Sequence, residues 1–244
     1  MALILVTGAS AGLGLATVTS LARAGHDVVL HARRPGRVAD PALRGAMRAV
    51  VYGDLGDLEE TVSVAQQANE IGRFDAVIHN AGVLRGPEVM AVNAVAPYVL
   101  TALMAPPARL VYLSSSMHLS GSADLRGLDP SRARGRAYED SKLYVTALAM
   151  AYARLRPDSM AHAVDPGWVP TRMGGPGAPD DLDEGHRAQE WLATADAGEI
   201  TPRSGGYWRH GRARGPHPAA TDPGFQDALL RRLEAYTGIA PAVG

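Results

Sequence analysis

A tyrosine and a lysine four residues apart, Tyr138 and Lys142, form a pair whose chemistry suggests catalysis. In a helix, residues spaced by four project from the same face, so the phenol and the amine become neighbours. A nearby ammonium stabilises a phenolate and lowers its pKa, which makes a tyrosine a better acid or base near neutral pH. We therefore expect Tyr138 to exchange a proton and Lys142 to lower the tyrosine pKa.

Composition gives this pair more weight than its spacing does. Lys142 is the single lysine among 24 basic residues, and all the others are arginines. Any surface helix can carry such a pair, but here the one compact ammonium of the chain falls beside the tyrosine. A serine run, Ser114–Ser116, ends an apolar segment, where a hydroxyl could orient a substrate carbonyl. Ser114 and Ser116 are equally well explained as turn-capping residues.

A glycine-rich segment near the start of the chain could bind phosphate groups. Residues 7–14 read Thr-Gly-Ala-Ser-Ala-Gly-Leu-Gly and connect an apolar run to a helical pattern. Glycines let the backbone approach a pyrophosphate, and the free N–H groups at a helix N-terminus favour an anion. The spacing differs from the common dinucleotide fingerprint, so an ordinary turn is the alternative. The turn residues expected to bind a dinucleotide are Gly8, Ser10, Gly12, Leu13 and Gly14.

Two arginines, Arg33 and Arg34, follow the second apolar run, where NAD-binding proteins commonly place an acidic residue. A carboxylate there would accept bonds from the ribose hydroxyls of NAD, whereas guanidinium groups favour the 2′-phosphate of NADP. We expect NADP(H) to be preferred over NAD(H), with Arg33 as the main contact. Arg34 fits a solvated surface position equally well.

Short apolar runs alternate with longer helical patterns along the chain, which predicts a parallel sheet covered on both faces. We expect one doubly wound α/β domain over residues 1–244. A stretch around residues 172–200, rich in Gly and Pro in its first half, is expected to form a lid over the site. The predicted strands are 2–7, 27–31, 49–52, 76–79, 109–114 and 161–165, with an edge strand near 205–208, and the predicted helices are 14–24, 57–70, 87–104, 136–156 and 222–236.

Composition argues against several classes of protein. The chain has 244 residues, no cysteine and a net charge of −1, which does not suit a disulfide scaffold, thiol catalysis or a nucleic-acid binder. The eight histidines show no metal-binding spacing, so we expect no metal. No segment reaches the length of a membrane span, and nothing resembles a signal peptide. We expect a cytoplasmic protein that acts on a small molecule.

In their order along the chain, these segments resemble the short-chain dehydrogenases/reductases. The resemblance extends from the first strand to about Thr171. It implies a Rossmann-type sheet of about seven parallel strands and an NAD(P)(H)-dependent oxidoreductase that interconverts carbonyls and alcohols. The motifs that carry it are the glycine turn, Asn80-Ala81-Gly82, Asn93, Ser115, Tyr138 with Lys142, and Asp165-Pro166-Gly167-x-Val169-x-Thr171.

The resemblance also implies roles for individual residues. Tyr138 is implied as the general acid/base, Ser115 as the group that orients the substrate, and Lys142 as a ligand of the nicotinamide ribose. Asn93 is implied in a proton relay through a water on its backbone carbonyl. Proline at position 97 has no N–H, so we expect a kink that leaves this carbonyl free. Dinucleotide contacts are implied for Asp54, Leu55, Asn80, Ala81, Gly82, Pro166, Gly167, Val169 and Thr171.

Two further features concern the substrate and the alternatives. The long interval between Ser115 and Tyr138 resembles the retinol-dehydrogenase-like branch, which acts on lipophilic carbonyls and alcohols. The family also implies a homodimer or homotetramer formed through the fourth and fifth helices. A histidine after the serines, His118, could be a further acid or base, although a loop histidine is more often structural. The alternative function is a catalytically idle NADP(H)-binding redox sensor or scaffold, which needs the turn and Arg33 alone. A nucleotide-sugar epimerase would need a longer C-terminal region.

Overall fold

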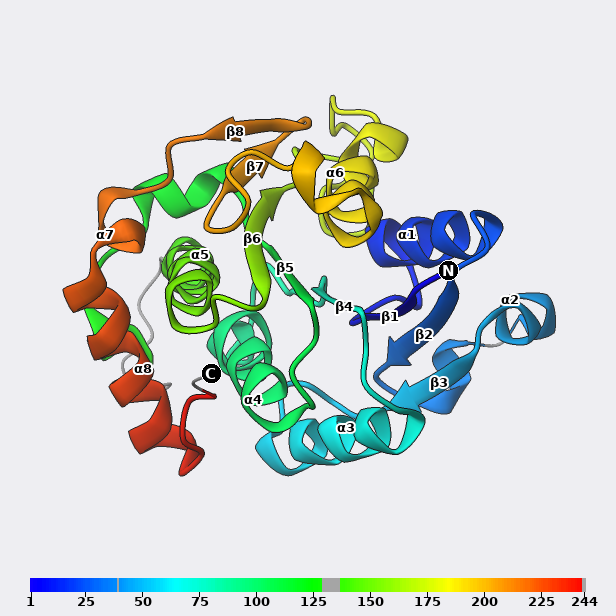
Figure 1. Cartoon of the computed structure of the whole chain (residues 1–244), viewed down its shortest axis with the longest axis horizontal. Coiled ribbons are helices and arrows are strands. Elements are labelled where there is room, and N and C mark those ends of the chain that lie inside the picture. The colour runs from blue at the N-terminus through cyan, green and yellow to red at the C-terminus, as the bar shows by residue number, and fades with distance from the viewer. Residues whose placement is uncertain (39, 129–136, 243–244) are drawn as a thin grey trace.

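One sheet organises the molecule and sets the direction of the loops around it. The computed structural model describes residues 1–38, 40–128 and 137–242 (Figure 1). Within these ranges eight strands lie in the order β3-β2-β1-β4-β5-β6-β7-β8, and all neighbours are parallel except β7 and β8. The strands are β1 (Leu3–Val6), β2 (Asp27–Ala32), β3 (Ala49–Tyr52), β4 (Ala76–His79), β5 (Arg109–Leu113), β6 (Met160–Asp165), β7 (Tyr207–Arg209) and β8 (Arg212–Arg214).

Helices cover both faces of the sheet, as the predicted doubly wound fold requires. In Figure 1, α1 and α6 lie on one face, and α3, α4 and α5 lie on the other. A π-helical turn, η2, runs directly into α4, and α8 packs against α5. The helices are α1 (Gly12–Arg23), α2 (Pro41–Ala46), α3 (Leu58–Ile71), α4 (Ala96–Leu103), α5 (Ala137–Leu155), α6 (Leu182–Thr194), α7 (Pro218–Thr221) and α8 (Pro223–Thr237), with the short turns η1 (Pro35–Arg37), η2 (Ala91–Val95), η3 (Ser116–Ser120), η4 (Leu125–Leu128) and η6 (Ala197–Glu199).

The core divides into two layers because successive strand residues face opposite sides of the sheet. Leu5 of β1 belongs to the layer beneath α3, α4 and α5, whereas its neighbours Ile4 and Val6 belong to the layer beneath α1 and α6. The middle of α5 is buried on all sides, from Ser141 to Tyr152. A helix surrounded in this way is fixed by packing along its whole length.

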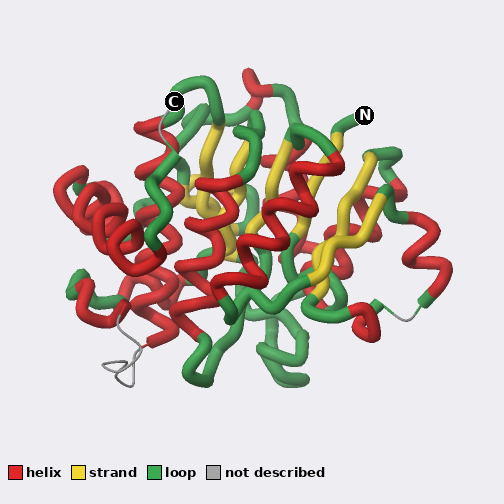
Figure 2. The backbone as a smooth tube through the Cα atoms, turned by 90° about the horizontal axis from the view of Figure 1, so that it is seen from below, coloured by secondary structure: helices red, strands yellow, loops and turns green. Residues whose placement is uncertain are grey.

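The strand order places the candidate site at one edge of the sheet. The chain builds β2 and β3 on one side of β1 and β4 to β7 on the other, so the order reverses between β1 and β4. Sheets of this kind bind ligands beyond the carboxyl ends of the strands at such a point. In Figure 2 both termini lie at the opposite edge. No helix in the described ranges is long and apolar enough to cross a bilayer.

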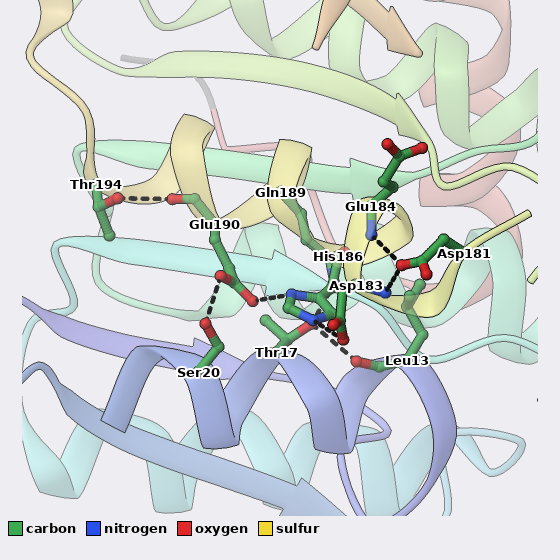
Figure 3. Close-up of polar contacts among 10 residues, drawn as sticks. All are labelled: Leu13, Thr17, Ser20, Asp181, Asp183, Glu184, His186, Gln189, Glu190 and Thr194. Carbon is green, nitrogen blue, oxygen red and sulfur yellow. Dashed lines mark hydrogen bonds and ion pairs between the residues drawn. The ribbon is translucent and has the colours of Figure 1, made fainter. Parts of the chain in front are cut away.

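Helix α6 was not predicted, and it occupies much of the range expected to form a lid, residues 172–200. It packs against α1 through polar groups (Figure 3). The Glu190 carboxylate accepts a hydrogen bond from Ser20 Oγ (2.8 Å) and lies 2.5 Å from His186 Nδ1, and Gln189 bonds the hydroxyl of Thr17. Helix α6 therefore forms the middle of the range in which a lid is expected. The helix predicted over 136–156 corresponds to α5, and its residue 136 lies outside the described residues.

Candidate active site

The glycine turn after β1 adopts a backbone that other residues would strain. Gly8 has φ +64° and Gly12 has φ +56°. A Cβ atom on Gly8 would lie 2.7 Å from Cα of Ala81, and one on Gly14 would lie 2.4 Å from Nδ2 of Asn80. The turn therefore packs directly against the segment after β4. This close approach explains why the sequence has glycine at these positions.

The turn leaves polar groups unpaired in the way that a bound dinucleotide requires. Ala11 precedes α1 and offers no side-chain cap, and no acidic residue occupies the first turn of the helix. The side chain of Asn80 donates to the carbonyl of Thr7 (2.9 Å), and its buried Oδ1 has no hydrogen-bond partner among the described residues. Thr171 reaches the turn from the segment after β6, 3.3 Å from a Cβ built on Gly12. These free donors and the free acceptor fit a dinucleotide with its phosphates at the helix N-terminus.

A buried histidine, His31 at the end of β2, holds the glycine turn in place through a hydrogen bond. Its Nδ1 accepts the N–H of Gly8 (3.0 Å), so its Nε2 carries the proton and donates to the carbonyl of Gly53 (3.0 Å). Burial is the main cause that lowers the pKa of His31, and the imidazole is neutral. No local sequence pattern reveals this role, because it depends on two contacts with residues more than twenty positions away.

Basic residues lie around the end of β2. The guanidinium of Arg33 is 58% exposed and lies 3.8 Å from the carboxylate of Asp54, which follows β3. Arg34 is exposed as well, and Leu55 is buried in the core. Ser10 of the glycine turn shares the wall of a cavity of about 730 Å³ with Arg37, which we had not singled out.

The catalytic candidates meet at the carboxyl ends of β4, β5 and β6. Ser115 follows β5 and lies close enough to Tyr138 on α5 for hydrogen bonding by its side chain to lower the pKa of the phenol. The amine of Lys142 lies 5.5 Å from the centre of the Tyr138 ring and donates to the carbonyl of Leu113 (2.8 Å). It also lies 3.5 Å from a Cβ built on Gly82, where the turn segment ends. The tyrosine and the lysine are therefore neighbours, and the lysine faces the glycine segment after β4.

The pKa values of this pair differ from the sequence expectation. The pKa of Tyr138 is raised to about 12, mainly by burial, while the bond to Ser115 lowers it. The pKa of Lys142 is lowered to about 8 by burial, against a raising effect of Asp165. Burial outweighs the effects that lower the pKa of the phenol, and the lowering effect expected of Lys142 stays a prediction.

Asn93 lies in the π-helical turn that precedes α4. Its side-chain amide is buried, exchanges two hydrogen bonds with the backbone of Val83 (2.8 and 2.9 Å) and donates to the hydroxyl of Ser141 (3.0 Å). The expected irregularity is present, because residues 91–95 form a π turn in place of a regular α-helix. Pro97, in the first turn of α4, cannot bond the Asn93 carbonyl.

His118 is a structural residue and not a free acid or base. Its Nδ1–H donates to the carbonyl of Ser115 (2.7 Å), and its Nε2 accepts the N–H of His217 (3.0 Å). The ring lies 4.5 Å from that of Tyr207 and is fully buried, and burial lowers the pKa of His118. Ser114 is structural too, since its hydroxyl bonds that of Thr146 (2.6 Å).

The segment after β6 forms a closed loop beside the catalytic residues. Trp168 holds it together, because its backbone N–H donates to Asp180 (2.6 Å) and its indole N–H donates to the carbonyl of Gly174 (2.7 Å). The indole is nevertheless 59% exposed. Three further large apolar side chains are exposed on this loop and on the turn after β5, namely Met117, Leu119 and Met173. Pro166 and Gly167 begin the loop, and Val169 is buried in it.

A doubly wound sheet with a glycine turn at its switch point and a serine, a tyrosine and a lysine at the neighbouring strand ends defines an oxidoreductase with a Rossmann-type nucleotide-binding fold. The sequence profile of the short chain dehydrogenases matches residues 2–181. The chain belongs to this family.

Relatives along the full length of the chain are oxidoreductases. An uncharacterized oxidoreductase of Emericella nidulans is 37% identical over 98% of both chains. Retinol dehydrogenase 13 of Mus musculus is 27% identical over 99% of this chain and 85% of its own, in agreement with the retinol-dehydrogenase-like pattern. The crystal structure of an NADPH-bound carbonyl reductase from chicken fatty liver has the same fold, with a TM-score of 0.69 and 22% identity over 87% of this chain and 98% of that chain.

Proposed function

We propose that this protein is an NADP(H)-dependent oxidoreductase that interconverts a carbonyl compound and its alcohol, with Tyr138 as the general acid/base. The observation that carries the proposal is the position of the Lys142 amine, 5.5 Å from the centre of the Tyr138 ring, with Ser115 close enough to lower the pKa of the phenol. This set lies next to Gly82, at the end of the segment that packs on the glycine turn. A carbonyl held there would meet two hydroxyl donors, and a reduced nicotinamide dinucleotide supplies the hydride when bound.

The residues that would hold the dinucleotide follow from the fit of the turn. Gly8, Gly12 and Gly14 let the backbone approach the pyrophosphate, with Ser10 and Leu13 beside them. Arg33, which is exposed beside Asp54, would bind a 2′-phosphate, with Asp54 and Leu55 near the adenine and Arg34 at the rim. Asn80, Ala81, Gly82, Pro166, Gly167, Val169, Thr171, Tyr138 and Lys142 would line the path to the nicotinamide.

Each catalytic side chain has a distinct task in the proposed reaction. Ser115 Oγ accepts the N–H of Met117 (3.2 Å), which leaves its own proton free to orient the substrate oxygen or the tyrosine. Tyr138 donates its phenolic proton to that oxygen during reduction and accepts it during oxidation. Lys142 holds a positive charge at the site, and Asn93 would pass protons through a water on its carbonyl. Because burial raises the pKa of Tyr138, the phenol is protonated at neutral pH and suited to reduction.

The proposed substrate is a small lipophilic ketone, aldehyde or quinone, or the corresponding alcohol. The four exposed apolar side chains beside the site, Met117, Leu119, Trp168 and Met173, support this choice. NADP(H) preference is supported by Arg33 and by the NADPH held by the chicken carbonyl reductase named above. The lid expected around residues 172–200 stays a prediction, which proteolysis with and without NADPH would test.

Assembly and location are part of the same proposal. We infer a cytoplasmic protein from its lack of cysteine. The homodimer or homotetramer implied by the family stays a prediction. Because α7 and α8 pack against α5, self-association through α5 would have to use the outer surfaces of these helices. The molecular mass in solution, by light scattering, would test it.

A panel of ketones, aldehydes and quinones, followed by the loss of NADPH absorbance, tests the activity. Tyr138→Phe is expected to lower turnover by about 1000-fold while NADPH binding stays within about threefold. Tyr144→Phe is the matched control, because it lies on the same helix and loses only a bond to the carbonyl of Asp124. NADPH binding without turnover of any carbonyl would instead support the redox sensor.

A further inference from the structure

One buried charge beside the catalytic residues has no task in the chemistry above. Asp165 ends β6 and is 2% exposed. Its carboxylate accepts the N–H of Gly167 (2.9 Å) and the hydroxyl of Tyr207 (3.1 Å), and it lies 3.7 Å from Nε of Arg209. A buried carboxylate costs several kcal/mol of solvation unless other groups compensate, so its presence at this point needs a reason.

The neighbouring buried charge is Lys142, which has no carboxylate in direct contact. It is 5% exposed, and its amine bonds the neutral carbonyl of Leu113. Within the described ranges, no ion pair of 4 Å or less includes this amine. Leu113 pairs with Val164 in the β5–β6 register, so the ammonium and the carboxylate lie at the ends of adjacent strands. Two opposite charges buried this close stabilise one another through a medium of low polarity.

We propose that Asp165 is a positioning residue that keeps Lys142 protonated by supplying a buried negative charge, and that Tyr207 holds this carboxylate in place. The inference rests on the proposed function only for its effect on turnover. The charge state of Lys142 can be measured without substrate or cofactor.

The electrostatic surroundings support this role. Asp165 raises the pKa of Lys142, which burial otherwise lowers to about 8. The groups around the pair leave Asp165 as the main negative charge, because burial keeps Tyr138, Tyr207 and His118 neutral near pH 7. Other titratable or charged groups on the elements packed here include Glu139 and Asp140 on α5, His162 on β6, Arg209 on β7, His217 before α7, and Asp180 and His210 beside Gly167.

Tyr207 connects this charge with the serine end of the site. Its hydroxyl bonds Asp165, and its ring packs on His118, which holds the carbonyl of Ser115. One tyrosine on the edge of the parallel sheet therefore supports the carboxylate and the catalytic serine segment together. Its removal should weaken the hold on Asp165 without removing the charge.

The single lysine of the chain permits a direct test. Protein grown with ¹³C-labelled lysine gives the side-chain signals of Lys142 alone, and their shift with pH reports its pKa in the full chain. Asp165→Asn keeps the shape and an acceptor for the Gly167 N–H but removes the charge, so we expect the pKa of Lys142 to fall by about one unit. Tyr207→Phe should shift it in the same direction by about half a unit. The control Asp227→Asn removes an exposed carboxylate that pairs with Arg154 on the outer surface, and no shift is expected.

An unchanged Lys142 titration in folded Asp165→Asn would overturn the proposal. If that variant does not fold, as judged by circular dichroism, an unchanged titration in Tyr207→Phe would overturn it equally. With a substrate in hand, the loss of turnover at high pH should begin about one unit lower in Asp165→Asn. A wild-type protein that reduces no carbonyl would refute the proposed function, and the lysine titration would still decide the present inference.

Discussion

The two ends of the candidate site, one for the nucleotide and one for catalysis, depend on different kinds of interaction. At the nucleotide end, the turn after β1 depends on backbone geometry, since Gly8 and Gly14 leave no room for a side chain. At the catalytic end, buried ionisable groups dominate, and burial moves the pKa of Tyr138 and that of Lys142 in opposite directions. The first end should therefore respond mainly to a change of shape. The second should respond mainly to a change of charge.

Both ends nevertheless use the same device, a neutral buried histidine, in opposite tautomers. His31 accepts through Nδ1 from the glycine turn, whereas His118 donates through Nδ1 to the carbonyl of Ser115. Each ring joins segments that are distant in sequence, and each would lose its acceptor on protonation. The two ends therefore bind different groups but are held in place in the same way.

The largest expected effect on cofactor binding comes from adding one methyl group at the nucleotide end. In Gly14→Ala the new Cβ would lie 2.4 Å from the amide of Asn80 and 2.8 Å from the carbonyl of Gly8. We expect NADPH affinity to fall by about 100-fold or more and the free energy of unfolding by about 2–4 kcal/mol. Gly45→Ala in α2 is the control, because nothing lies within 4 Å and its φ is ordinary, so stability should rise slightly. Normal NADPH binding by Gly14→Ala would contradict the steric account.

A charge change at the nucleotide end should alter selectivity and little else. Arg33→Ala removes the guanidinium beside Asp54, and we expect the preference for NADPH over NADH to fall by about 10- to 100-fold. Dissociation constants for the two cofactors measure it. Arg34→Ala should change the ratio by about threefold or less. An equal effect of both variants would mean that the 2′-phosphate of NADPH is bound by both arginines of the exposed loop and not mainly by Arg33.

Acid should weaken both ends through their histidines. The folded pKa of His31 and that of His118 are lowered, so the unfolded chain binds a proton first as the pH falls. The free energy of unfolding should therefore decrease below pH 6.5, by about 1.4 kcal/mol per pH unit for each histidine until its folded pKa is reached. Urea unfolding between pH 7 and 5 measures it. The slope should become shallower in His31→Gln and in His118→Gln, and slopes equal to that of the wild type in both variants would refute the assignment.

The smallest effect is expected at the α1–α6 contact shown in Figure 3. Glu190→Gln removes the charge that pairs with His186 but keeps an acceptor for Ser20, so stability should fall by about 1 kcal/mol. NADPH affinity should change by about twofold or less, because the substitution leaves the turn at the start of α1 unaltered. Thermal unfolding and cofactor titration measure both, with the exposed Glu199→Gln as control. A large loss of affinity would show that α6 supports the nucleotide end directly.

Much of the fold could be predicted because it is encoded locally. The apolar runs predicted strands β1 to β7 in their order along the chain. The order of the motifs predicted the glycine turn, Ser115, Tyr138 and Lys142 as site residues. β8 escaped notice because all its residues are exposed and show no apolar alternation. Helix α6 was missed because it packs on α1 partly through polar groups, which hide its periodicity, and because a Gly- and Pro-rich stretch precedes it.

The remainder of the site depends on contacts that no local pattern reveals. His31 acts through Gly8 and Gly53, more than twenty residues away, and Asp165 acts through Tyr207, 42 residues on. The spacing of Tyr138 and Lys142 correctly predicted that they are neighbours. It could not show how deeply the fold buries them, and burial decides the pKa of both groups.

The burial of α5 has a consequence for attempts to redesign this protein. Every residue from Ser141 to Tyr152 is buried. Substitutions along that stretch would therefore create packing defects more readily than a new substrate specificity. Freedom to vary lies at the exposed apolar positions beside the site, Met117, Leu119 and Met173. Libraries confined to these positions should yield altered substrate ranges at little cost in folding yield, while the helix that carries the chemistry stays untouched.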